Sequence, residues 1–107
     1  MNFSNLLPDM LNAAKTPLAK QWNEAKPYAE EQLQSFIQSI ERVALLKLEG
    51  SITEEQAKLL VSMHKRSMIT VFLTIKGLGL LAIESAINAA LGVARDTINT
   101  ALGWKIL

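Results

Sequence analysis

The chain has few side chains of the types that carry out catalysis or bind metals. His64 is the only histidine, cysteine is absent, and the paired carboxylates Glu30, Glu31, Glu54 and Glu55 fall in or near expected first helical turns. Negative charge is favourable there without any catalytic task. One histidine also excludes the two Glu-x-x-His motifs of a di-iron bundle. We therefore expect no enzyme activity, no catalytic or metal-binding residue and no cofactor.

Three basic residues, Lys58, Lys65 and Arg66, form a cluster with His64, which we expect on the solvated surface. Such a cluster either contacts anionic lipid headgroups or keeps one end of a helix solvated, and both interpretations stay open. No aromatic residue is interleaved with it, and the formal net charge is only +1. A nucleic-acid partner is therefore not expected.

The glycines in Lys76-Gly77-Leu78-Gly79-Leu80-Leu81-Ala82 have the spacing of a nucleotide-binding loop. The surrounding sequence is apolar and helical, however, and no alternation of strands and helices accompanies the motif. Two glycines weaken a helix and need a packing reason. We expect a kink, a break or a close helix crossing at Gly77 and Gly79.

A near repeat occupies the last quarter of the chain. Ile87-Asn88-Ala89-Ala90-Leu91-Gly92 returns eleven residues later as Ile98-Asn99-Thr100-Ala101-Leu102-Gly103, with five of six positions identical. Eleven residues make almost three helical turns, so the repeat predicts a stripe along one long helix.

The two sides of this expected helix differ in character. Its small and aliphatic side should pack against another helix, because small residues spaced by four allow close backbone approach. These packing residues are Ala82, Ala86, Ala90 and Ala94 with Ile83, Ile87, Leu91 and Ile98. The polar arc contains Glu84, Asn88, Arg95 and Asn99. Glu84 and Arg95 are about 16 Å apart along the helix, so they would pair only across helices.

The rest of the sequence predicts helices that position this segment. Apolar residues at steps of three and four near the start predict a short helix with Pro8 in its first turn, and breaks near residues 15 to 17 and 26. An amphipathic helix is expected from Pro27 to about Glu49. Gly50 to Thr53 predicts a tight antiparallel corner, with Thr53 and Gln56 as a capping box.

Charge divides the chain into two halves. Sixteen of the 21 acidic and basic residues lie in positions 1–66, and 67–107 is an apolar helical segment. The run from Ser67 to Ile83 approaches the length of a membrane span, but Lys76 near its middle disfavours insertion by roughly 2.5 to 3.5 kcal/mol. We expect one all-α domain over 1–107, a helical bundle with a hairpin centred on Gly50 to Thr53.

This pattern indicates contact with partners. We expect a non-enzymatic interaction or assembly protein that self-associates or packs with partner helices through its apolar C-terminal half. The alternative is a peripheral or integral membrane or lipid-binding protein that uses the same wide apolar face. Asp9 interrupts the early apolar residues and no basic region precedes them, so no cleavable secretory signal is expected. Cytoplasmic and membrane-associated locations both remain open.

Overall fold

The computed structural model describes residues 2–107, which form an all-α helical bundle. Four α-helices and two short 3-10 turns account for this part of the chain, and no strand occurs in it. The α-helices are α1 (Leu7–Lys15), α2 (Trp22–Leu48), α3 (Glu54–Leu73) and α4 (Leu80–Leu102), and the 3-10 turns are η1 (Ser4–Leu6) and η2 (Ala19–Gln21). The predicted fold class is confirmed.

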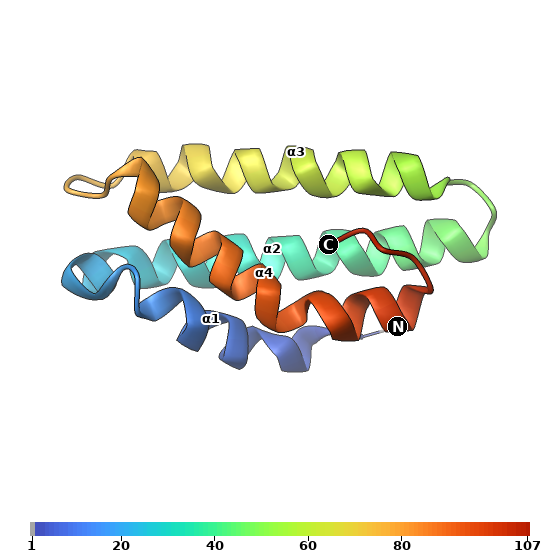
Figure 1. Ribbon diagram of the computed structural model, residues 1–107, viewed down its shortest axis with the longest axis horizontal. Helices are drawn as coiled ribbons and strands as arrows, with labels where there is room; N and C mark the ends of the chain where they lie inside the picture. The colour runs from blue at the N-terminus through green and yellow to red at the C-terminus, as the bar shows by residue number, and fades with distance from the viewer. Residues whose placement is uncertain (1) are drawn as a thin grey trace.

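The helices are arranged around an antiparallel hairpin of α2 and α3, which run along the 43 Å length of the molecule (Figure 1). α4 returns obliquely across this hairpin, and the short α1 lies beside α2 and α4 (Figure 1). α4 packs most extensively on α1 and also on α3, while α2 contacts both α1 and α3. The nine-residue α1 therefore completes the bundle by covering the side of α4 that the hairpin leaves open.

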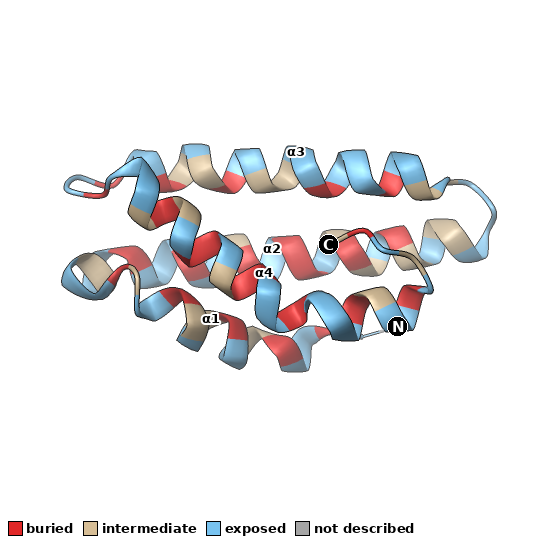
Figure 2. Cartoon of the chain, in the orientation of Figure 1, coloured by how far each residue is buried: buried red, intermediate tan, exposed pale blue. Residues whose placement is uncertain are grey.

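The core is formed by apolar side chains from every helix and from the connection between α3 and α4. Figure 2 shows buried segments on the inward sides of all four helices. Among the largest fully buried side chains are Met10 of α1, Phe36 of α2, Met68 of α3 and Ile98 of α4. No polar or charged residue in the described part of the chain is fully buried. Helix packing here is therefore driven by apolar burial.

The predicted corner between α2 and α3 is present. Gly50 has a φ of 71° and allows a left-handed end to α2, with Ser51 N donating to Leu46 O at 2.8 Å. Thr53 Oγ1 accepts a hydrogen bond from Gln56 N at 3.1 Å, and Gln56 Oε1 accepts one from Thr53 N at 2.9 Å. This reciprocal pair is the predicted capping box.

The expected break near residue 26 is wrong, although α1 does end at Lys15, within the other expected break. α2 begins at Trp22 and continues through Pro27. The proline removes one helical hydrogen bond near the start of the helix. Ala25 and Ala29 are both completely buried on either side of it, so burial of this end of α2 in the core outweighs the local cost.

The predicted interruption at Gly77 and Gly79 is a full chain reversal. α3 ends at Leu73 and α4 begins at Leu80, with Gly77 at a φ of 89° and Gly79 as the N-cap of α4. The apolar run from Ser67 to Ile83 is consequently divided between two helices. No helix within residues 2–107 is both long enough and apolar enough to cross a membrane.

The two copies of the repeat end differently. Gly92 lies within α4, whereas Gly103 adopts a φ of 70° and ends the helix. The alanines at matching positions also differ, because Ala90 is completely buried and Ala101 is exposed. Only the first copy therefore has its alanine in the core.

This difference gives a matched test of the packing of α4. Replacing Ala90 by Leu should destabilise the protein by about 1 to 3 kcal/mol, because the added volume has no space in the core. Replacing Ala101 by Leu at the matching exposed position should change stability by less than about 0.5 kcal/mol. Thermal unfolding measures both. Equal melting temperatures for the two variants would contradict this packing.

Candidate interaction surface

The predicted packing residues of α4 lie inside the chain's own bundle. Seven of them are buried, with exposed fractions of 8% or less, and Ala82 is half-buried. The buried seven are Ile83, Ala86, Ile87, Ala90, Leu91, Ala94 and Ile98. A partner therefore reaches them only if the bundle opens.

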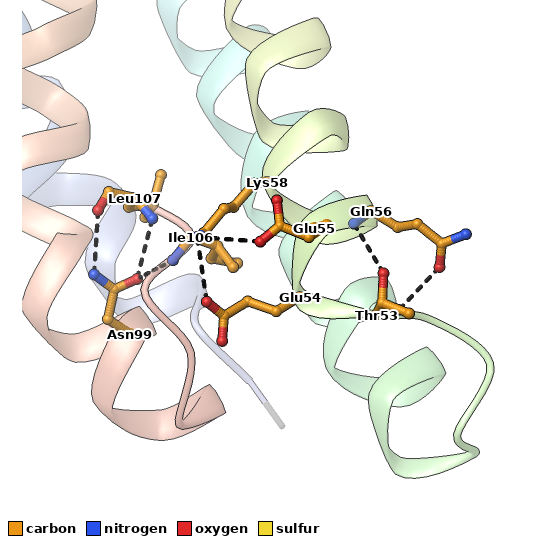
Figure 3. Close-up of polar contacts among 8 residues, drawn as sticks. All are labelled: Thr53, Glu54, Glu55, Gln56, Lys58, Asn99, Ile106 and Leu107. Carbon is orange, nitrogen blue, oxygen red and sulfur yellow. Dashed lines mark hydrogen bonds and ion pairs between the residues drawn. The ribbon is translucent and has the colours of Figure 1, made fainter.

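The predicted polar arc of α4 is divided among several environments. Asn99 holds the C-terminal residues against the helix: its Oδ1 accepts hydrogen bonds from Ile106 N at 3.0 Å and Leu107 N at 3.1 Å, and its Nδ2 donates to Leu107 O at 3.2 Å (Figure 3). Arg95 Nε is 3.6 Å from Asp96 Oδ1, and both side chains are largely exposed. Glu84 is half-buried and Asn88 is exposed.

The residues of the predicted basic cluster lie on different sides of α3, because successive residues are rotated by about 100° around a helix. Lys58 and Lys65 line a groove of about 450 Å³ between α3, α4 and the C-terminal residues, together with Arg95. Arg66 is exposed and does not line this groove. Lys58 Nζ is 3.3 Å from Glu54 Oε2 and 3.7 Å from Glu55 Oε1 (Figure 3). The groove therefore combines three cationic side chains with an apolar lining that includes Val61, Leu91 and Ile106.

The outer face of α3 carries large apolar side chains that are exposed to solvent, as does the end of α2 with Leu45 and Leu48. Leu59 and Met63 are 61% and 56% exposed and, being four residues apart, are neighbours on one side of the helix. Leu60 and Leu73 are 44% and 49% exposed. We define the outer face of α3 by Leu59, Leu60, Met63 and Leu73. Sequence analysis did not identify it, although plotting α3 on a helical wheel from Thr53 would have placed Leu59 and Met63 opposite the buried Ala57, Val61 and Met68.

A second apolar groove adjoins this face. It has a volume of about 210 Å³, lies between α2 and α3, and is lined by Leu60 together with Ile40, Val43, Leu46 and His64. Leu60 belongs to both the groove and the outer face of α3. The apolar surface of the hairpin therefore continues from α3 toward α2.

His64 is more enclosed than the sequence suggested. Its ring packs edge-on against Phe36, with a centroid distance of 5.5 Å and an interplanar angle of 82°. Burial disfavours the charged imidazolium, so the pKa of His64 is lowered from its usual 6.5. Its position on α3 turns it toward α2, whereas the neighbouring Arg66 is exposed.

Two further polar contacts fasten the ends of the described chain to α2, and sequence analysis identified neither. Glu41 Oε2 accepts a hydrogen bond from Phe3 N at 2.7 Å at the start of η1. Lys47 Nζ donates to the Leu102 carbonyl oxygen and lies 4.7 Å from the centroid of a Trp104 ring. A cation at the C-terminal end of α4 also interacts favourably with the helix dipole.

Similarity to known proteins identifies no family for this arrangement. No family model matches the chain, and neither curated proteins nor solved structures give a match to it. Across residues 2–107, no group of three or more acidic or histidine side chains is placed to hold a metal ion. The features that remain as candidates for function are the apolar and charged surfaces described above.

His64 gives a pH-dependent prediction. Because its pKa is lower in the folded state, its contribution to stability is fully present above pH 6.5 and is lost as the pH falls through 6.5 toward the folded-state pKa. The wild-type melting temperature should therefore fall more between pH 7.5 and pH 5 than that of His64→Leu. Thermal unfolding monitored by circular dichroism measures this difference. Identical slopes for the two proteins would show that His64 is solvated.

Proposed function

We propose that the protein is a non-enzymatic helical interaction protein that binds an amphipathic helix, of its own kind or of a partner, on the outer face of α3. The observation that supports this proposal is the exposure of Leu59 and Met63, each more than half accessible and adjacent on the same face. We propose the hairpin and not α4 for this contact, because the predicted packing residues of α4 are already covered by the chain's own helices.

Part of the apolar surface of α3 is still exposed to water in the monomer. Fully burying a leucine or methionine side chain stabilises a protein by about 1.5 to 3 kcal/mol relative to leaving it in water. Leu59, Leu60 and Met63 obtain only part of that stabilisation within the monomer. An incoming helix with apolar residues at matching steps of three and four would bury the remainder.

The shape of the surface also suits a helix. The adjoining groove between α2 and α3 gives the contact a second apolar wall that begins at Leu60. A helix placed along α3 would cover the exposed Leu59 and Met63 and extend toward this groove. Hydrophobic interfaces of this kind depend on a few central side chains surrounded by polar positions, as Leu59 and Met63 are here by Gln56, Ser62 and Arg66.

The test uses a synthetic 18-residue amphipathic peptide of Leu, Lys and Glu as the probe. Binding should shift the backbone amide NMR signals of α3 around Leu59 and Met63, and Leu59→Gln/Met63→Gln should weaken binding at least tenfold, because each leucine-sized contact is worth more than about 1.4 kcal/mol. Leu80→Gln/Leu81→Gln is the matched control, since those side chains are exposed at the start of α4. Equal peptide affinity for both double variants would reject the proposed surface.

A second candidate function rests on the groove between α3 and α4. Its three cationic side chains, Lys58, Lys65 and Arg95, surround an apolar lining, which suits an anionic amphiphile such as a lipid with a phosphate or carboxylate headgroup. The volume of about 450 Å³ lies within the usual range for small-molecule sites. This candidate retains two of the three basic residues predicted to contact headgroups and replaces Arg66 with Arg95.

Binding to lipid vesicles distinguishes this second candidate function from the proposed binding of a helix. The protein should cosediment with vesicles containing phosphatidylserine and much less with pure phosphatidylcholine vesicles, since each basic residue contributes on the order of 1 kcal/mol at an anionic surface. Lys58→Gln/Lys65→Gln/Arg95→Gln should lose this binding. The control Lys15→Gln/Lys20→Gln/Lys26→Gln removes the same charge elsewhere and should retain most of it. Equal losses in both variants would show a nonspecific effect of net charge and reject the groove.

A further inference from the structure

We propose that the helix bound on the outer face of α3 is α3 of a second copy of this chain, packed antiparallel, with Glu55 of each copy beside Arg66 of the other. This inference rests on the proposed function and names its partner. It follows from the order of charged and apolar residues along α3, which makes the face complementary to itself.

The relevant residues follow one another along a single side of the helix. Glu55, Leu59, Met63 and Arg66 are separated by four, four and three residues. At ~100° per residue they fall within an arc of about 80°. The face therefore presents an acidic group toward the start of α3, two large apolar side chains in the middle and a basic group eleven residues after the acidic one.

A two-fold axis brings these residues into opposite pairs. When two identical helices pack antiparallel about such an axis, residues equally far from it on either side face each other. An axis passing α3 between Leu60 and Val61 places Glu55 opposite Arg66, Leu59 opposite Ser62 and Met63 opposite Lys58, and symmetry repeats each pair. Leu59 of each copy then lies only about 1.5 Å along the helix from Met63 of the other. A parallel arrangement in register would instead place Glu55 against Glu55 and Arg66 against Arg66.

The charges on this face are available for such a contact. The Glu55 side chain is 86% exposed, and its one ion pair is an i,i+3 contact of 3.7 Å with Lys58 on the same helix. Arg66 is exposed and forms no ion pair within residues 2–107. Long-range attraction would favour the antiparallel orientation during encounter, and the apolar centre would supply most of the affinity.

The size of the face sets the expected strength of the dimer. The segment of α3 that is symmetric about the proposed axis runs from Glu54 to Ser67, which is about 21 Å of helix roughly 10 Å wide. This strip is smaller than the ~800 Å² per partner of a standard stable interface. A dissociation constant in the micromolar range is therefore expected, and the monomer keeps its own complete core.

Charge reversal tests both the partner and the register. We would measure self-association by sedimentation equilibrium for Glu55→Arg, Arg66→Glu, the double variant Glu55→Arg/Arg66→Glu and a 1:1 mixture of the two single variants. Each single variant places like charges together twice and should dimerise roughly ten- to thirtyfold more weakly than the wild type. The double variant and the mixture restore opposite charges at both sites and should recover most of the affinity. Glu31→Arg, the same charge change at an exposed position of α2, should behave as wild type.

Each result has a definite meaning. Recovery in the 1:1 mixture supports the antiparallel pairing, because a folding defect in either single variant is not repaired by mixing. If the single variants dimerise as the wild type does, or if mixing restores nothing, the proposed register is wrong. If no wild-type dimer forms but the synthetic peptide still binds at Leu59 and Met63, the second copy is excluded while the proposed helix-binding function stands. Association only with phosphatidylserine vesicles would overturn the second copy in favour of a membrane surface.

Discussion

The close packing of α4 on α1 is the constraint on which the rest of the structure depends. Ala86, Ala90 and Ala94 are almost fully buried, and side chains this small let two helix backbones approach closely. Because α4 is apolar over most of its circumference, it is covered on two sides. The short α1 covers one side and the hairpin covers the other. This arrangement uses the inward side of α3 and leaves the opposite side, with Leu59 and Met63, in contact with water.

Much of the fold could be predicted from local patterns. The capping box at Thr53 and Gln56, the turn at Gly50 and the apolar periodicity of α2 depend on residues close together in sequence, and the structure contains all three. The break expected near residue 26 does not occur because the local cost of Pro27 is outweighed by the burial of Ala25 and Ala29, a tertiary effect that no local pattern contains. The contacts Glu41 to Phe3 and Lys47 to Leu102 were missed for the same reason, since they join residues 38 and 55 positions apart.

The candidate site was harder to predict than the fold. The periodicity of α4 indicates a stripe of small and aliphatic residues, but periodicity does not say whether such a stripe is covered by the same chain or by another one. Only the three-dimensional arrangement shows that α4 is covered internally and that Arg66 does not line the groove that contains Lys58 and Lys65. The buried side of α3 and the proposed helix-binding side consist of different residues, so substitutions at Leu59 or Met63 should affect association without removing a core contact.

The central claim is that the outer face of α3 pairs two copies side by side, and small-angle X-ray scattering across a concentration series tests it most directly. Because the proposed axis passes about three residues from the midpoint of α3, a dimer should approach twice the 11.8 kDa mass of one chain while its longest dimension exceeds the 43 Å of the monomer by only about 10 Å, with most growth in the cross-section. A mass that remains at 11.8 kDa at the highest concentration, or a particle that doubles in length, would contradict this account.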